Sequence, residues 1–336
     1  MAKRRIGPFE VEPVGLGCMS LSWAYGTPPS DADGERLLHR ALDLGYDFLD
    51  TAALYGTGHN ETLIGRALKA RRGAFTLASK CGIRVTDGGR GRALDGSLAG
   101  IAAVLDDSLQ RLGVDHIDLY YLHRLDPATP IEESVDALAG AVRAGKVGAI
   151  GLSEVSAATL RRAAAVHPIA ALQTEYSLWT RQPEIAVLDA CRDLGTTFVA
   201  FSPVGRGFLA GGMLDPASLP DKDIRRSMPR FREPNYAQNL RLPDALRAVA
   251  AETGLTPAQL CLAWLLTKDD ALVTIPGTAN LDHLEENWAA RDIRLDAETM
   301  ARLDALINQA TVAGHRYGPA MNASIDTEDF AAAGDA

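Results

Sequence analysis

The chain lacks the long apolar runs, clustered cysteines and extended basic patches that mark several classes of protein. No stretch of its 336 residues approaches the ~20 apolar residues that a membrane span requires. Its four cysteines lie far apart and show no metal-site spacing, so we expect reduced thiols in the core and no bound metal. The net charge of −9 argues against nucleic acids and anionic membranes as partners.

A secretion signal is also lacking. The basic start from Met1 to Arg5 resembles the beginning of one, but glycines, prolines and glutamates follow it where an apolar segment is required. We therefore expect a cytoplasmic protein. With 47% hydrophobic residues, the chain has enough apolar material for one large core, so we expect a single domain over residues 1–336. We expect a tail over residues 311–336 that is partly disordered at its end.

What the chain does contain is a repeated alternation of short apolar run, polar loop and amphipathic helix. The predicted strands are Val14–Met19, Tyr46–Asp50, Phe75–Lys80, Ile117–His123, Val147–Leu152, Ala170–Gln173, Thr197–Phe201 and Ala271–Ile275. The predicted helices are Asp33–Leu44, Asn60–Ala70 with Asn60 as its cap, Ser97–Leu112, Ile131–Ala144, Ser156–Val166, Pro183–Leu194, Thr256–Thr267 and Leu281–Ala290.

Strands that alternate with helices imply a parallel sheet, and eight strands imply that the sheet closes into a barrel. We expect an α/β protein, a single (β/α)8 TIM barrel with an N-terminal β-hairpin, a long loop after strand seven and extra C-terminal helices. A doubly wound sheet is the alternative, but Gly15-Leu16-Gly17 is too short for its glycine-rich turn and no helix follows. The long segment Ser202–Leu242 is typical of a lid or binding loop.

Reactive polar residues follow several of these strands. Asp50, Lys80 and His123 end their apolar runs, and Tyr55 lies on the loop after Asp50. In a parallel barrel the C-terminal strand ends share one face, which holds the active site. A plain buried ion pair between Asp50 and Lys80 is the alternative interpretation.

These four residue types can together deliver a proton. A free tyrosine has a pKa near ~10 and is a poor acid at neutral pH. A lysine ammonium ~4 Å away would stabilise its phenolate by about 4 kcal/mol at an effective dielectric of ~20. We therefore expect Lys80 to lower the pKa of Tyr55, with Asp50 holding Lys80 in place. Such a tyrosine is suited to protonate a carbonyl oxygen.

The same residues resemble a known family. The segment Asp50 to Gly56 followed by Asn60-Glu61 is similar to the aldo-keto reductase signature. Further similar segments span most of the chain in family order: Gly15 to Met19, Tyr120 to Arg124, Gly151 to Glu154, Gln173 to Leu178, Phe201 to Gly207 and Ile275 to Thr278. The similarity is strongest to microbial and plant NADPH-dependent reductases, a branch related to potassium-channel β subunits.

The resemblance implies a role for each matching residue. Tyr55 would be the general acid, Lys80 and Asp50 its tuning pair, and His123 a donor that orients the substrate. Ser153 and Gln173 would bind the nicotinamide carboxamide, and Phe201 would stack on its ring. The remaining implied cofactor residues are Ser202, Pro203, Val204, Gly205, Arg206 and Gly207 at the pyrophosphate, and Ile275, Gly277, Thr278, Asn280, His283 and Asn287 beyond it.

Two positions depart from the family pattern. Glu154 stands where many members carry asparagine, and it either accepts from the carboxamide or turns away. Relatives often place lysine or arginine after the Pro-Gly-Thr, near the 2′-phosphate of NADP, whereas here none stands between Thr278 and Asn287. Thr278, Asn280 and His283 remain as phosphate ligands. We expect NADP(H) as the preferred cofactor, with NAD(H) as the alternative.

The expected substrate is a small aldehyde or ketone. Trp23, Tyr25, Trp179 and Phe231 lie on loops of the predicted active-site face and would form an apolar pocket for a hydrophobic carbonyl compound. The leading hypothesis is an NADP-dependent reductase of the alcohol dehydrogenase (NADP+) type. The alternative is an NADP(H)-binding regulatory subunit of the channel-β type with little turnover. A homo-oligomer is compatible with the sequence, and a barrel hydrolase lacks its paired carboxylates or metal.

Overall fold

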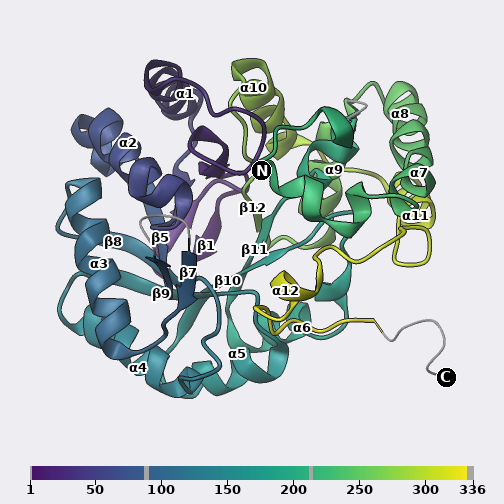
Figure 1. The fold of residues 1–336 in the computed structure, drawn as a ribbon. Coiled ribbons are helices and arrows are strands. Elements are labelled where there is room, and N and C mark those ends of the chain that lie inside the picture. Colours follow the sequence, from purple (N-terminus) through teal and green to yellow (C-terminus); the bar gives the residue numbers. More distant parts are fainter. Residues whose placement is uncertain (1, 87–90, 212–214, 331–336) are drawn as a thin grey trace.

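A parallel eight-stranded sheet, ringed by helices, forms the centre of the computed structural model, which describes residues 2–86, 91–211 and 215–330 (Figure 1). The strands are β3 (Leu16–Gly17), β4 (Phe48–Asp50), β5 (Thr76–Cys81), β8 (Ile117–Leu122), β9 (Val147–Ser153), β10 (Ile169–Glu175), β11 (Thr197–Phe201) and β12 (Val273–Thr274). Backbone bridges between Val14 and Thr274 and between Gly17 and Gly277 join the two outer strands. The predicted (β/α)8 barrel is confirmed.

Helices surround the sheet, each near its predicted place. They are α1 (Asp31–Leu44), α2 (His59–Leu68), α3 (Leu98–Leu112), α4 (Ile131–Arg143), α5 (Ala157–Ala164), α6 (Val187–Leu194), α9 (Pro257–Lys268) and α10 (Leu281–Ala289). Serine side chains cap three of them, since Ser30, Ser97 and Ser156 each accept a bond from a backbone N–H of the first turn.

The prediction that Asn60 caps its helix is wrong. The helix begins at His59 and its N-cap is Gly58, whose φ of 89° suits glycine. Asn60 is fully buried inside α2, where its amide donates to the Cys18 carbonyl at 2.9 Å and its oxygen accepts from Thr51 at 2.6 Å. The side chain therefore ties the start of α2 to two strand ends of the barrel mouth.

Further helices and short 3-10 helices lie outside the eight strand–helix units of the barrel. Helices α7 (Asn235–Asn239), α8 (Arg241–Thr253), α11 (Ala297–Leu306) and α12 (Pro319–Asn322) also follow β11; α11 and α12 agree with the predicted extra C-terminal helices, whereas α7 and α8 were not predicted. The 3-10 helices are η1 (Met19–Leu21), η2 (Tyr55–Gly58), η3 (Lys69–Ala74), η5 (Gln182–Glu184), η6 (Gly205–Ala210), η7 (Pro216–Ser218), η8 (Ile224–Ser227), η9 (Pro229–Phe231) and η10 (Ala290–Asp292).

Two hairpins stand apart from the central sheet. The N-terminal one, β1 (Arg4–Ile6) with β2 (Phe9–Val11), confirms the predicted hairpin. Its buried Ile6 and Val11 belong to the apolar cluster inside the barrel, so this hairpin closes the end opposite the active-site face. The second, β6 (Ile83–Thr86) with β7 (Gly91–Leu94), follows β5 and was not predicted. It contributes side chains to the pocket described below.

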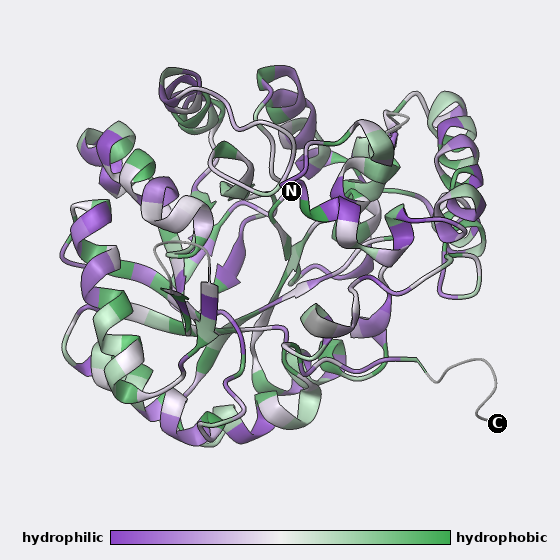
Figure 2. Cartoon of the chain, viewed as in Figure 1, coloured by the Kyte–Doolittle hydropathy of each residue, from purple (hydrophilic) through white to green (hydrophobic). Residues whose placement is uncertain are grey.

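The main core lies between the sheet and the helices, because its cluster of buried apolar residues combines residues of the strands with residues of the helices. Figure 2 shows that the surrounding helices carry both hydrophobic and hydrophilic residues. Burying one such leucine or valine stabilises the fold by about 1.5–3 kcal/mol. The four cysteines are free and buried within this core, as expected. Burial raises the pKa of the Cys81 and Cys191 thiols to about 12, so both are inert at neutral pH.

Across the described part of the chain, no single helix combines the length and apolar composition needed to cross a bilayer. Taken as a pair, the helical stretch Asn235–Thr253 and helix Pro257–Lys268 pass that test of length and composition, with a bend of 83° between them. Among the same described residues, no group of three or more histidine, cysteine, aspartate or glutamate side chains is placed to hold a metal ion.

The end of the chain returns to the barrel. Asp326 forms a parallel bridge with Val155 and accepts hydrogen bonds from Ser156 at 2.9 Å and Thr159 at 2.6 Å. Asp326 and Glu328, which accepts from the backbone N–H of Ala157 at 2.7 Å, therefore attach this segment to the start of α5. The disorder predicted at the very end of the tail concerns residues 331–336, which lie outside the described residues.

Candidate active site

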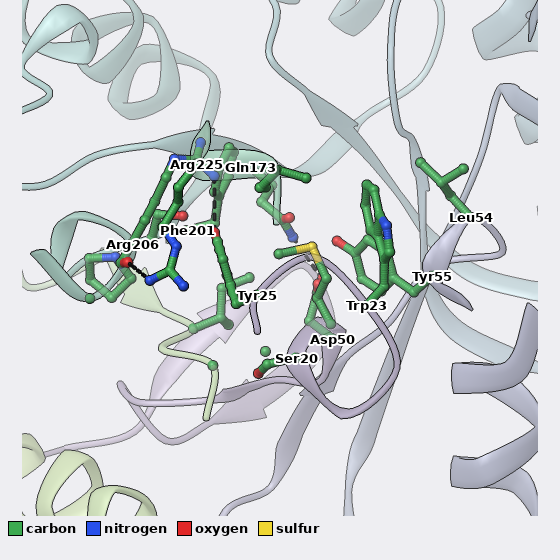
Figure 3. A pocket seen from close by; sticks show the side chains of 18 of the residues that line it. Ser20, Trp23, Tyr25, Asp50, Leu54, Tyr55, Gln173, Phe201, Arg206 and Arg225 are labelled. Atoms are coloured by element: carbon green, nitrogen blue, oxygen red, sulfur yellow. Dashed lines mark hydrogen bonds between the residues drawn. The ribbon is translucent and has the colours of Figure 1, made fainter. Parts of the chain in front are cut away.

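A cavity of about 810 Å³ opens at the C-terminal ends of the barrel strands. Figure 3 shows that its labelled side chains form two groups, with Trp23, Leu54 and Tyr55 at one end and Phe201, Arg206 and Arg225 at the other. Asp50 and Gln173 lie between the two groups. A cavity of this volume, lined from Tyr55 at one end to Arg206 at the other, has room for a reacting centre and an extended ligand.

Lys80 is the centre of the reactive end. It is buried at the end of β5, where its ammonium pairs with Asp50 and donates to the Thr51 carbonyl at 2.8 Å. The same nitrogen lies 3.3 Å from the hydroxyl of Tyr55. Burial alone would lower the pKa of Lys80, but the charges of Asp50 and Tyr55 and the hydrogen bonds to both residues together outweigh it and raise the pKa. The lysine is therefore a fixed cation beside the tyrosine.

The pKa of Tyr55 departs from the sequence-based expectation. Burial raises it above its usual value, and the Lys80 ammonium offsets only part of that effect. The reason is that Tyr55 is only 8% exposed, whereas the expectation considered the lysine charge alone. The phenol is consequently held protonated at neutral pH, which is the form that a proton donor needs.

His123 faces Tyr55 across the reactive end. The two rings meet edge to face, with centroids 6.0 Å apart and an interplanar angle of 85°. Burial lowers the pKa of His123 well below its usual value, and the positive charges of Arg124, Lys80 and Arg92 lower it further. The imidazole is therefore neutral at physiological pH, and its N–H can donate a hydrogen bond to a carbonyl oxygen.

A tight turn presents Tyr55 to the cavity. Gly56 and Thr57 both adopt left-handed backbone conformations, with φ of 58° and 56°. Thr57 is not a glycine, so its conformation is strained, as is common at functional sites. Buried Glu61 supports the region from α2 by accepting from Ser79 at 2.5 Å and from Arg111 at 2.7 Å.

The predicted carboxamide residues line the middle of the cavity. Gln173 donates from its amide nitrogen to Asp50 at 2.7 Å, which leaves its amide oxygen to accept from a ligand. Ser153 receives a 3.3 Å contact from the Arg124 guanidinium. Phe201 ends β11 half-buried, unlike the four buried residues before it, and its ring borders the cavity. A flat aromatic face beside two amide-binding side chains fits a nicotinamide ring.

Most of the other predicted cofactor residues also border the cavity. These are Ser202, Pro203, Val204, Arg206, Gly207, Ile275, Gly277, Thr278, His283 and Asn287. Gly205 and Asn280 do not. The oxygen of the Asn280 side chain caps α10 by accepting from the backbone N–H groups of Asp282 at 2.7 Å and His283 at 3.2 Å. Its contribution to the site is thus to fix the start of the helix that carries His283 and Asn287.

Arg206 lies in a different environment from the one its position suggested. Its guanidinium pairs with Glu175 at 2.5 Å and donates to the hydroxyls of Tyr25 and Tyr317 at 3.0 Å each. The side chain is 4% exposed. The Glu175 carboxylate therefore compensates the charge of Arg206, which we had expected to bind the pyrophosphate of the cofactor.

A second buried pair adjoins the first. Glu154 turns away from the cavity and binds the Arg316 guanidinium through both oxygens, at 2.6 and 3.0 Å. It also accepts from the backbone N–H of Glu175 at 2.9 Å, and Arg316 lies 3.7 Å from the Glu175 carboxylate. This buried ionic cluster of Glu154, Glu175, Arg206 and Arg316 joins the strand ends, the loop after β11 and the C-terminal segment.

Two of the four predicted pocket aromatics are in place and two are not. Trp23 and Tyr25 line the cavity. Trp179 and Phe231 are each 2% exposed and lie outside the lining, so their prediction as pocket residues is wrong. Their rings pack on Phe208, at centroid distances of 4.7 and 5.9 Å. The segment after β11 folds over Trp179 and includes Phe231 itself, and its shape could not be predicted from the sequence.

Several lining residues were not assigned from the sequence. Arg124 directly follows His123 within a matched segment, which was a usable signal. Further lining residues come from the β6–β7 hairpin, the segment after β11 and the C-terminal segment, namely Ile83, Arg92, Ala93, Leu94, Arg225, Met228, Tyr317, Met321 and Ser324. These residues reach the cavity only through tertiary packing between distant segments, so no local sequence pattern predicted them as lining residues.

Comparison with known proteins agrees with this geometry. A sequence profile described as the Aldo/keto reductase family matches residues 13–308. The chain is 42% identical over 327 residues to the aldo-keto reductase yakc (NADP(+)) of Schizosaccharomyces pombe, with 96% of each chain covered. It is 40% identical over 311 residues to a probable aldo-keto reductase 1 of Glycine max, covering 92% of this chain and 89% of that one.

The fold is similar to that of a solved glycerol dehydrogenase from Gluconobacter oxydans. The TM-score is 0.83 at 27% identity, with 95% of this chain and 97% of the other covered. Together with the barrel, these matches define the chain as an oxidoreductase of the TIM-barrel type. The chain belongs to the aldo-keto reductase family.

Proposed function

We propose that this protein reduces aldehydes and ketones to alcohols with NADP(H), with Tyr55 as the general acid. The observation that carries the proposal is the 3.3 Å contact between the Tyr55 hydroxyl and the Lys80 ammonium on the wall of the cavity. A buried Lys–Asp pair without such a contact would be purely structural. Here the lysine points its charge at a hydroxyl that borders open space.

The residues of the cavity fit a nicotinamide dinucleotide. The cavity is lined by a glutamine whose oxygen is available to accept, by a half-buried aromatic ring, and by Arg206 and Gly207 of a turn with three consecutive left-handed residues, Gly205 to Gly207. Ser153 and Gln173 would hold the carboxamide, Phe201 the ring face, and Asn287 the adenine. When bound, the cofactor supplies the hydride; the protein orients it and excludes water.

The chain's own residues handle the proton. In the reduction, the Tyr55 hydroxyl hydrogen moves to the carbonyl oxygen as negative charge develops there. Lys80 stabilises the resulting phenolate, and Asp50 keeps Lys80 in position. His123, neutral because its pKa is low, donates to the same oxygen and fixes its direction. The match to a relative named for NADP(+) supports the phosphorylated cofactor and the alcohol dehydrogenase (NADP+) type of activity.

The proposal is tested with the purified full-length protein. Tryptophan and cofactor fluorescence would be titrated with NADPH and NADH, followed by NADPH oxidation with a panel of neutral aldehydes and ketones that includes 4-nitrobenzaldehyde. We expect saturable binding and steady-state turnover. Tight NADPH binding without turnover on any carbonyl compound would contradict the reductase and favour a cofactor-sensing subunit.

A further inference from the structure

The arginines of the cavity differ in how their charge is compensated. Four arginines line it, and two of them have carboxylate partners: Arg206 pairs with Glu175 at 2.5 Å and Arg225 with Asp223 at 2.7 Å. For the other two, Arg92 and Arg124, no ion pair is formed with any residue in the described ranges. Within the described part of the chain, the cavity therefore carries two positive charges that no carboxylate compensates.

Both uncompensated arginines lie at the reactive end. Arg124 follows His123 and donates to its backbone carbonyl at 2.7 Å and to the Ser153 hydroxyl at 3.3 Å. Its charge acts on Tyr55 as well as on His123. A guanidinium carries five donor N–H groups, and these two bonds use only one of its nitrogens.

Arg92 approaches from the β6–β7 hairpin. Its guanidinium carbon lies 4.4 Å from the centre of the Trp23 ring, and that ring is stacked on Tyr55 with centroids 6.4 Å apart and a 30° interplanar angle. The guanidinium, the indole and the phenol thus form a row that ends at the proton donor. Partial burial lowers the pKa of Arg92, because the guanidinium loses part of the water that stabilises its charge.

A guanidinium that is partly dehydrated and lacks a carboxylate partner is suited to bind an external oxyanion. Its planar fork matches the two oxygens of a carboxylate or phosphate, and such charge-assisted bonds are about twice as strong as neutral ones. The cofactor phosphates are assigned to the opposite end, at the loop after β11. The oxyanion near Trp23 must therefore belong to the molecule being reduced.

We propose that the substrate is a carbonyl compound that carries an oxyanion, which Arg92 and Arg124 bind while the carbonyl group faces Tyr55 and His123. This inference rests on the proposed function and narrows its substrate class. Apolar walls alone had suggested a hydrophobic aldehyde. The two arginines add a polar anchor beyond Trp23, and a carboxylate is the first candidate for the group they hold.

The test compares two aldehydes of nearly identical shape. 4-Carboxybenzaldehyde and 4-nitrobenzaldehyde both carry a planar two-oxygen group opposite the aldehyde, but only the first is an anion. The measured quantity is the ratio of kcat/KM for the carboxylate to kcat/KM for the nitro compound. Dividing the ratio of a variant by that of the wild type cancels the intrinsic difference in aldehyde reactivity.

Arg92→Gln is expected to lower this ratio at least tenfold, mainly through KM for the carboxylate. Arg84→Gln is the matched control, because it removes the same charge from the same hairpin. Arg84 is 53% exposed, pairs with Asp95 at 2.8 Å and is not part of the lining. It precedes Val85, the register partner of Arg92, and so lies on the opposite face. Its ratio should stay within twofold of the wild type.

Arg124→Gln provides the second variant and should also lower the ratio. A parallel pair, glyceraldehyde 3-phosphate and glyceraldehyde, distinguishes a phosphate from a carboxylate as the preferred oxyanion. If neither pair of aldehydes shows a changed ratio in Arg92→Gln and Arg124→Gln, the inference is overturned. If the wild type reduces none of the four aldehydes, the proposed reductase function itself has failed, which is a separate result.

Discussion

Gln173 donates a 2.7 Å hydrogen bond to Asp50, the residue that holds Lys80 in place. A side chain assigned to the cofactor is therefore directly joined to the proton-donating group. The bond also fixes which end of the amide faces the ligand, because the nitrogen is engaged and the oxygen is left to accept. Cofactor binding and proton delivery share one hydrogen-bonded chain that runs from β10 through β4 to β5.

This relationship predicts that Gln173→Leu weakens both functions. We expect NADPH affinity to fall about tenfold, since a hydrogen bond within a buried site contributes about 1 kcal/mol or more. We also expect kcat to fall, because Asp50 loses a donor. Thr174→Val is the control: Thr174 is the next residue on the strand, and its buried hydroxyl forms no bond to the described residues. Equal effects of the two substitutions in fluorescence titrations and assays would contradict the coupling.

Tyr55→Phe tests the proton donor. The substitution keeps the ring that stacks on Trp23 and removes only the hydroxyl, so cofactor binding should persist. General acid catalysis contributes about 10²–10⁴-fold, and we expect kcat for carbonyl reduction to fall by at least that range. Fluorescence titration with NADPH serves as the internal control. Wild-type turnover by the variant would remove Tyr55 from its assigned role.

The low pKa of His123 predicts a dependence of stability on pH. In the unfolded chain the imidazole has its ordinary pKa near ~6.5 and takes up a proton below that value, whereas the folded protein keeps it neutral. The unfolded state thus binds more protons, and the folded state loses up to about 1.4 kcal/mol per pH unit as the pH falls below ~6.5. His123→Gln should flatten this dependence in urea unfolding at pH 7.5, 6.0 and 5.0. Identical slopes for the two proteins would refute it.

Arg316→Met tests the buried ionic cluster. The substitution leaves Glu154, which is fully buried, without the guanidinium that binds both its oxygens. Breaking a buried ion pair from one side costs about 3–5 kcal/mol, and we expect that loss in the free energy of unfolding. Arg162→Met removes a two-bond pair with Glu132 at the surface, where both side chains are exposed, and should cost less than about 1 kcal/mol. Comparable losses in denaturant titrations would contradict the structural role of the cluster.

Glu286→Gln tests cofactor choice. Glu286 lines the cavity near His283 and Asn287, at the end assigned to the adenosine, and no lysine or arginine stands between Thr278 and Asn287. Its carboxylate should repel a 2′-phosphate, so the substitution is expected to tighten NADPH binding several-fold and leave NADH binding nearly unchanged. Glu285→Gln is the control, because Glu285 pairs with Arg40 and does not line the cavity. An equal shift for both cofactors would exclude this repulsion.

The sequence by itself determined the barrel and the reactive end of the site. Alternating strand and helix patterns place polar residues at successive strand ends, and parallel strands bring those ends together whatever the loops do. That is why Asp50, Lys80 and His123 could be assigned from their positions. Tyr55 could be placed at the same face because it lies on the loop after a strand, but its role as the acid was implied by the resemblance of Asp50 to Gly56 to the aldo-keto reductase signature.

Only the tertiary structure decided which distant segments complete the cavity. Arg92 arrives on a hairpin, Tyr317 on the returning chain end, and Trp179 is withdrawn beneath the segment after β11. Burial likewise decided the pKa of Tyr55, since desolvation depends on everything packed around the ring and not on its neighbours in the sequence. Local sequence patterns predict where a strand runs and which residue ends it. Contacts between segments hundreds of residues apart form only when the chain folds, so no local pattern predicts them.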